Sequence, residues 1–149
     1  MKRMLCIIIC LLIPFSAFAD MIEEYNLHTV NTGAKELTGI PEKDERDGKI
    51  IHLYTVTDNI KVQITYIDNE ARVFSCLCFD ESETAEFLAQ SANCVLQIGG
   101  YGSMFLCYAD ILDMFLQARA GHETENRKTD NLVYILEKTS FGYLFMIAR

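Results

Sequence analysis

The fold is decided by residues 60–79, which read IKVQITYIDNEARVFSCLCF. Apolar and polar side chains alternate from Ile60 to Tyr66, which is the pattern of a strand that buries one face. Asp68-Asn69-Glu70 then supplies a turn, and residues 71–79 follow as a strand whose two faces are both largely apolar. A strand of that kind lies inside a sheet, so we expect it to be central and covered by helices on its cysteine face.

Further strand signals flank this pair. Residues 50–57, 132–138 and 143–148 are rich in β-branched and aromatic side chains, and the last two segments frame a turn, as in a hairpin. Residues 25–30 are a weaker strand candidate. The turn-rich, charged segment 31–48 is predicted to be a surface loop.

A first helix is predicted from about residue 80 to Ile98. Asp80 can accept backbone amides at the helix start, with Glu83 three residues later as in a capping box. Its inward stripe has helical spacing and consists of Phe87, Leu88, Ser91, Ala92, Cys94, Val95 and Ile98. Gly99-Gly100 is expected to end it, since glycine accepts the left-handed conformation at a helix C-terminus.

A second helix is predicted to begin after Ser103 and to end near Ala120. The side chains expected to point inward are Met104, Tyr108, Ile111 and Phe115. The order strands, two helices, strands indicates the α+β class, because the two kinds of element are segregated along the chain. We therefore predict one domain over residues 20–149, a mainly antiparallel sheet of about five or six strands packed against an αα-hairpin.

The N-terminus predicts export. Lys2 and Arg3 precede an apolar run over Met4–Pro14, and Ala17-Phe18-Ala19 follows, as in a secretory signal peptide cleaved after Ala19. The run is shorter than the roughly 20 residues that a membrane-spanning helix needs. We expect residues 1–19 to be removed, and the mature protein to reach the periplasm, or the medium where no outer membrane exists, without spanning a membrane.

The mature chain would be acidic. Loss of Lys2 and Arg3 leaves 11 basic residues against 21 acidic ones, a net charge of −10. Such a charge repels nucleic acid and anionic lipid, and it speeds encounter with a basic partner.

Four cysteines remain after residue 19, namely Cys76, Cys78, Cys94 and Cys107. An even number in an oxidising compartment suggests disulfides, and four cysteines allow three complete pairings. Cys76 and Cys78 are two apart in a strand, so they leave the same face toward the helices. We expect Cys76 to pair with Cys107 and Cys78 with Cys94. The Cys-x-Cys spacing does not match a zinc module, and no metal site or cofactor is predicted.

Two segments are candidates for partner contact. The first is the loop Gly99–Ser103, in which Tyr101 is a large amphipathic side chain among glycines, next to Ser103. The second is the charged loop, in which Asp44, Glu45 and Asp47 would form an acidic rim for a basic partner.

No catalytic motif stands out, and His28, His52 and His122 belong to no recognisable nucleophile signature, so we predict that the chain is not an enzyme. The leading hypothesis is an exported protein that inhibits another protein. Examples are an immunity protein that neutralises a toxin attacking the cell wall, and an inhibitor of a basic wall hydrolase, each acting by occlusion of the partner's active site. An accessory protein of pilus or secretion machinery is the alternative, followed by a module that binds a small ligand.

Overall fold

The computed structural model of the protein describes residues 20–99, 104–122, 124–129 and 132–149. Its centre is a seven-stranded antiparallel sheet in the order β1-β2-β3-β4-β7-β6-β5. The strands are β1 (Glu42–Arg46), β2 (Lys49–Thr55), β3 (Ile60–Ile67), β4 (Glu70–Cys78), β5 (Thr124–Thr129), β6 (Leu132–Thr139) and β7 (Gly142–Ala148). β4 pairs with β3 on one side and β7 on the other, so its central position is confirmed.

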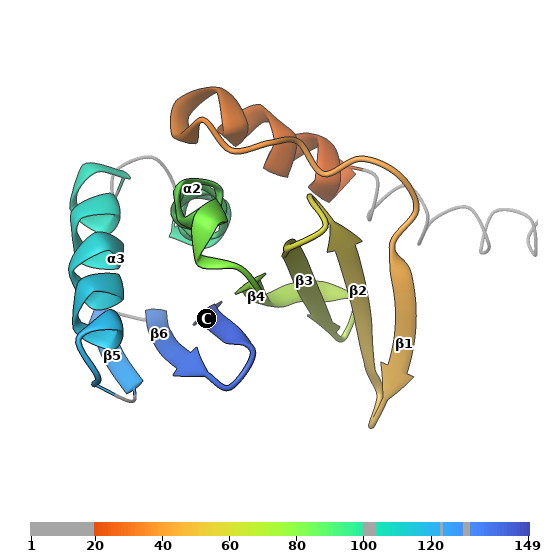
Figure 1. Ribbon diagram of the computed structural model, residues 1–149. Helices are drawn as coiled ribbons and strands as arrows, with labels where there is room; N and C mark the ends of the chain where they lie inside the picture. The colour runs from red at the N-terminus through yellow and green to blue at the C-terminus, as the bar shows by residue number, and fades with distance from the viewer. Residues whose placement is uncertain (1–19, 100–103, 123, 130–131) are drawn as a thin grey trace, which may run out of the picture.

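The helices lie on one face of the sheet (Figure 1). A short 3-10 turn, η1 (Glu81–Glu83), leads into α2 (Thr84–Gly99), and α3 (Met104–Arg119) follows. The N-terminal helix, residues 20–32, crosses above α2 and the ends of β2 and β3. The α+β class with an antiparallel sheet is confirmed.

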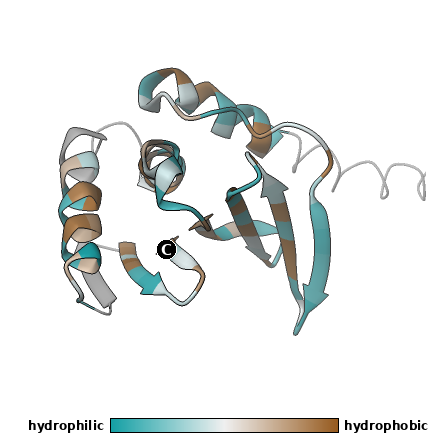
Figure 2. Cartoon of the chain, viewed as in Figure 1, coloured by the Kyte–Doolittle hydropathy of each residue, from teal (hydrophilic) through white to brown (hydrophobic). Residues whose placement is uncertain are grey.

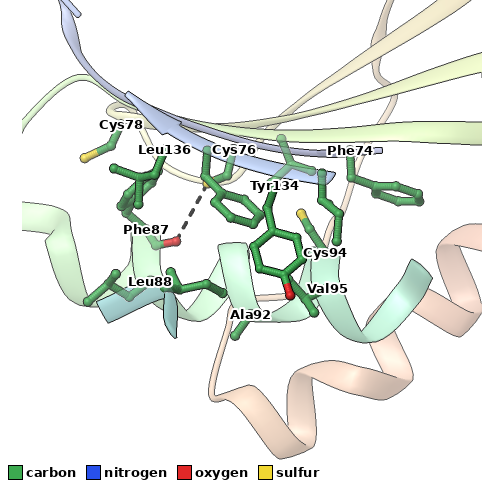
Figure 3. Packing of buried hydrophobic residues seen from close by; sticks show 14 of the residues in the cluster. Phe74, Cys76, Cys78, Phe87, Leu88, Ala92, Cys94, Val95, Tyr134 and Leu136 are labelled. Atoms are coloured by element: carbon green, nitrogen blue, oxygen red, sulfur yellow. Dashed lines mark hydrogen bonds between the residues drawn. The ribbon is translucent and has the colours of Figure 1, made fainter. Parts of the chain in front are cut away.

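The core is the layer between the sheet and α2. Phe74 and Cys76 point from β4, and Tyr134 and Leu136 point from β6, toward the stripe of α2 that begins at Phe87 (Figure 3). Every residue of the stripe predicted for this helix is buried. Among the α3 side chains that the structure describes, those from residue 108 on, Ile111, Met114, Phe115 and Ala118 are buried, whereas Tyr108, predicted to point inward, is 41% exposed. The side chain of Met104, also predicted to point inward, lies outside the described residues. Tyr108 lies on the outer stripe with Leu112 and Leu116, because residues four apart share a helix face.

The segment 31–48, predicted to be a surface loop, contains the edge strand β1. β1 forms a hairpin with β2 through Asp47-Gly48, where φ is 52° and 72°, as the two-residue turns of hairpins require. All five of its side chains are exposed, and Figure 2 shows it as hydrophilic throughout. An edge strand tolerates such a sequence because charge on an edge discourages pairing with other chains. β5 forms the opposite edge.

The prediction of a strand at residues 25–30 is wrong, because this segment belongs to the N-terminal helix. Tyr25, His28 and Thr29 are its buried side chains, at a spacing of three and four residues. That spacing was present in the sequence, but two of the three residues are polar and do not count in an apolar pattern.

The predicted helix start at Asp80 is correct, although the partner expected for Glu83 is not. The carboxylate of Asp80 accepts the backbone amide of Ser82 at 2.8 Å. The carboxylate of Glu83 accepts the Thr57 hydroxyl at 2.5 Å and the Asn59 amide at 3.0 Å. Glu83 therefore ties the β2–β3 turn to the start of α2, and these hydrogen bonds lower its pKa.

Candidate functional site

A cavity of about 750 Å³ lies between the N-terminal helix and the β1–β2 edge of the sheet. One wall is the outward side of the helix, the other is the segment 36–41, and the floor is formed by His52 and Tyr54 of β2. We call this cavity the edge groove. Its lining residues are Ile22, Glu23, Asn26, Leu27, Val30, Glu36, Gly39, Ile40, Pro41, Lys43, His52 and Tyr54.

The walls of the edge groove expose large apolar side chains. Leu27 is 64% exposed, Val30 87% and Ile40 95%. The first two lie on the helix and the third lies on the opposite wall. Single exposed apolar residues are ordinary on a protein surface, but a group that lines one cavity is a candidate site of contact.

The opposite side of the same helix is held to α2 by polar groups. The Tyr25 hydroxyl donates to Oε1 of Gln90 at 2.8 Å, and Nδ2 of Asn93 donates to the Tyr25 carbonyl oxygen at 2.9 Å. The Thr32 hydroxyl donates to Oδ1 of Asn93 at 3.0 Å. Gln90 and Asn93 have no exposed surface. The N-terminal helix thus buries hydrogen-bonding groups together with the Tyr25 ring and presents Leu27 and Val30 to solvent, whereas an ordinary surface helix turns such apolar side chains inward.

The second wall is fixed to the first by Asn26. Its Oδ1 accepts the backbone amide of Leu37 at 2.8 Å, and its Nδ2 donates to the Leu37 carbonyl oxygen at 3.0 Å. The Leu37 side chain is buried beneath the segment. Both walls are therefore held by hydrogen bonds that do not depend on an occupant.

The charges around the edge groove are unevenly placed. Glu23 and Glu36 line it, and among the described residues neither forms an ion pair. Among the described residues that line the groove, the one cation is Lys43, which lies opposite His52 in the β1–β2 register.

The imidazole of His52 and the phenol of Tyr54 form the floor, and the phenol of Tyr66 lies against the His52 ring. His52 is 2% exposed, and its ring meets those of Tyr66 and Tyr54 at centroid distances of 4.9 and 6.4 Å. Burial, and secondarily the charge of Lys43, lowers the pKa of His52. Burial raises the pKa of Tyr54 to about 12 and that of Tyr66 further. The floor is therefore uncharged at neutral pH, which suits an apolar occupant.

The lowered pKa of His52 predicts that acid destabilises the protein. Below the ordinary histidine pKa of about 6.5 the unfolded chain takes up a proton that the folded chain resists, so stability falls as pH drops. For one proton, the slope is at most about 1.4 kcal/mol per pH unit. We expect urea unfolding between pH 7.5 and 5.5 to show that the free energy of unfolding falls less steeply with decreasing pH in His52→Gln than in the wild type. Equal slopes for the two proteins would contradict the assignment.

Of the predicted partner-contact residues, the three that the structure describes, Asp44, Glu45 and Asp47, do not line the edge groove. Asp44 and Glu45 lie in β1, where the Asp44 carboxylate pairs with Nε of Arg46 at 2.6 Å. Asp47 lies at the tip of the β1–β2 hairpin, which points away from the N-terminal helix (Figure 1). Tyr101 and Ser103 fall outside the described residues. Leu27, Val30 and Ile40 were not predicted as contact residues, because an apolar side chain is ordinarily expected inside and nothing in the sequence marks these three as exposed.

The predicted disulfide between Cys78 and Cys94 is not formed. Both residues are free thiols, as is Cys76. The thiol of Cys78 donates to the Asp80 carbonyl oxygen at 3.1 Å, while Sγ of Cys94 lies 3.5 Å from the Tyr25 hydroxyl. The two cysteines therefore have different neighbours at separate points along the core. Cys76 has its thiol against the Phe87 carbonyl oxygen (Figure 3), and the side chain of its predicted partner, Cys107, lies outside the described residues.

In the part of the chain that the structure describes, no three His, Cys, Asp or Glu side chains gather as ligands for a metal ion. The described helices also include none with the length and apolar character needed to cross a membrane.

Comparison with protein-family models, curated proteins and solved structures found no match to the chain. The edge groove is therefore interpreted from its own geometry.

Proposed function

We propose that the protein is an exported binding protein that captures a segment of another protein in the edge groove. The observation that supports this most directly is the N-terminal helix, which leaves Leu27 and Val30 exposed although Gln90 and Asn93 are buried beneath it. Leaving these apolar side chains in water forgoes about 25 cal/mol for each Å² that a partner would cover. A bound segment recovers that free energy.

Inhibition of the captured protein is the form of binding that we favour. The net charge of −10 expected after removal of residues 1–19 would steer a basic toxin or wall hydrolase toward the domain. A domain anchored through the groove would then cover the partner's active site. In this proposal the partner contacts the groove walls, whereas the sequence predicted contact at the charged loop. An accessory role in pilus or secretion machinery would use the same groove with a partner that is not an enzyme.

A small apolar ligand is a second candidate. The groove volume of about 750 Å³ lies within the range of small-molecule sites, and His52 and Tyr54 supply convergent polar groups. Small-molecule sites, however, bury roughly 70–90% of the ligand surface. Walls with Val30 and Ile40 exposed by 87% and 95% are too open for such enclosure, which favours a macromolecular occupant.

Site-specific photo-crosslinking tests the proposal. A photoreactive side chain replaces Ile40 in one protein and Leu116, an exposed apolar residue on α3, in a matched control. In cells that export the protein, we expect one defined adduct from position 40 and none from position 116. The trapped partner, once purified, should lose its activity when the wild-type protein is added. Adducts of equal pattern from both positions would contradict a groove-specific partner.

A further inference from the structure

We infer that the segment received by the edge groove is a cationic amphipathic helix. This inference rests on the proposed function and specifies the chemistry of the partner. Two features of the groove carry it: the apolar walls described above and the acidic groups Glu23 and Glu36 that border them.

The walls select the backbone conformation of the occupant. Leu27, Val30 and Ile40 offer hydrocarbon contacts, and a backbone amide placed against hydrocarbon must already have its hydrogen-bond partner. An α-helix meets this condition because its amides bond within the segment. The lining residues from Ile22 to Val30 extend about 12 Å along the N-terminal helix, which matches two turns of a helix packed alongside.

The border charges select the polar face of the occupant. Glu23 and Glu36 are exposed, and no cation of the described residues pairs with them. If the apolar row of a helix enters the groove, the residues that flank this row would lie beside these carboxylates. Lysine or arginine at those positions gains two charge contacts, whereas glutamate would be repelled. Lys43 has the opposite sign and weakens the binding of a cationic helix at its own end of the groove.

The experiment uses a fluorescent synthetic helix of leucine and lysine, roughly 18 residues or five turns long, with leucine at helical spacing. The first control peptide has the same composition, with leucine and lysine in alternation. The second control peptide keeps the helical spacing of leucine and has glutamate in place of lysine. The binding partner is the protein purified after expression of the complete chain. Affinity is measured by fluorescence anisotropy at low salt and in about 1 M salt, where the Debye length is about 3 Å.

Three charge reversals give the sharpest result. We expect Glu23→Lys and Glu36→Lys each to weaken binding of the leucine–lysine helix by about fivefold at low salt, and Lys43→Glu to strengthen it by a similar factor. Glu137→Lys, on β6 across the sheet, controls for the change in net charge. A folding defect cannot strengthen binding, so the opposite signs separate recognition from misfolding. All three effects should shrink in 1 M salt.

Apolar variants test the walls. The double variant Leu27→Ser/Ile40→Ser should lower affinity by more than about tenfold, since each leucine- or isoleucine-sized side chain contributes roughly 1.5–3 kcal/mol when fully buried. The matched control, Leu112→Ser/Leu116→Ser on the exposed stripe of α3, should bind as the wild type does.

The inference is overturned if the alternating or glutamate peptide binds as tightly as the leucine–lysine helix, or if the charge reversals and the Glu137 control act alike. If no peptide binds while position 40 still crosslinks one partner, the helix inference fails and the proposed function stands. If position 40 also yields no specific adduct, both fail.

Discussion

Gly142→Ala should unfold the protein. A Cβ atom at this position would lie 1.9 Å from the carbonyl oxygen of Cys78 and 2.9 Å from its carbonyl carbon. Both atoms belong to the backbone of β4, which cannot swing aside as a flexible side chain can. The φ of 141° at Gly142 adds strain for any residue with a side chain.

The affected contact joins the two halves of the sheet. β4 and β7 pair from Cys78↔Tyr143 to Val73↔Ala148, so relief of the clash would have to separate the central strands. We expect a loss of at least about 4 kcal/mol, a large part of the roughly 5–15 kcal/mol that holds an ordinary domain together. The measurement is urea unfolding followed by circular dichroism.

Gly48→Ala is the matched control for this prediction. Gly48 also has a positive φ, 72°, but no heavy atom lies within 4 Å of its missing Cβ. Gly48→Ala should therefore lower the free energy of unfolding only by the conformational strain of a positive φ, about 1–2 kcal/mol. Equal losses for the two variants would show that the close approach to Cys78 is not the cause.

Tyr25→Ala should release the N-terminal helix and abolish the edge groove. The Tyr25 ring is fully buried and stacks on Phe74 with a centroid distance of 6.1 Å and an interplanar angle of 5°. Its removal leaves a cavity in the core and deprives Gln90 of a hydrogen-bond donor. Truncation of a buried aromatic side chain to alanine costs about 3–5 kcal/mol.

Hydrogen exchange locates this effect. Amides of residues 20–32 should lose protection in Tyr25→Ala more than those of β4 and β7, because the helix contacts the domain chiefly through this side chain and its polar neighbours. Tyr25→Phe keeps the ring and should cost about 1–2 kcal/mol, the contribution of one buried hydrogen bond. Leu27→Ala, two residues away but 64% exposed, should change stability by less than about 0.5 kcal/mol. Global unfolding without earlier exchange at 20–32 would contradict local release.

The central strands were predictable because their pattern reflects a local cause. Alternation over residues 60–66 and two apolar faces over residues 71–79 follow from burial on one face or both, and β3 and β4 occupy those positions. The same holds for the buried stripe of α2, whose period is set by the helix itself. The edge strands escaped prediction because pairing along one edge imposes no apolar pattern on β1.

The candidate site was less predictable. Leu27 and Val30 carry no sign in the sequence that they face solvent, since an apolar side chain is ordinarily expected inside. Their exposure depends on Gln90 and Asn93, more than 50 residues away in the chain, which hydrogen-bond the other side of the same helix.

By itself, the sequence determined the α+β class, the central strand β4, the buried stripe of α2 and the helix start at Asp80. Each depends on side-chain periodicity or on a hydrogen bond between near neighbours. Only the tertiary structure decided that residues 20–32 form a helix that buries Tyr25, His28 and Thr29, that three cysteines stay apart as thiols, and that Ile40 faces Leu27 across a groove. Those outcomes depend on contacts between residues that are far apart in the chain. Such contacts, rather than the residue alone, set the free energy of a buried hydrogen bond or of an exposed leucine.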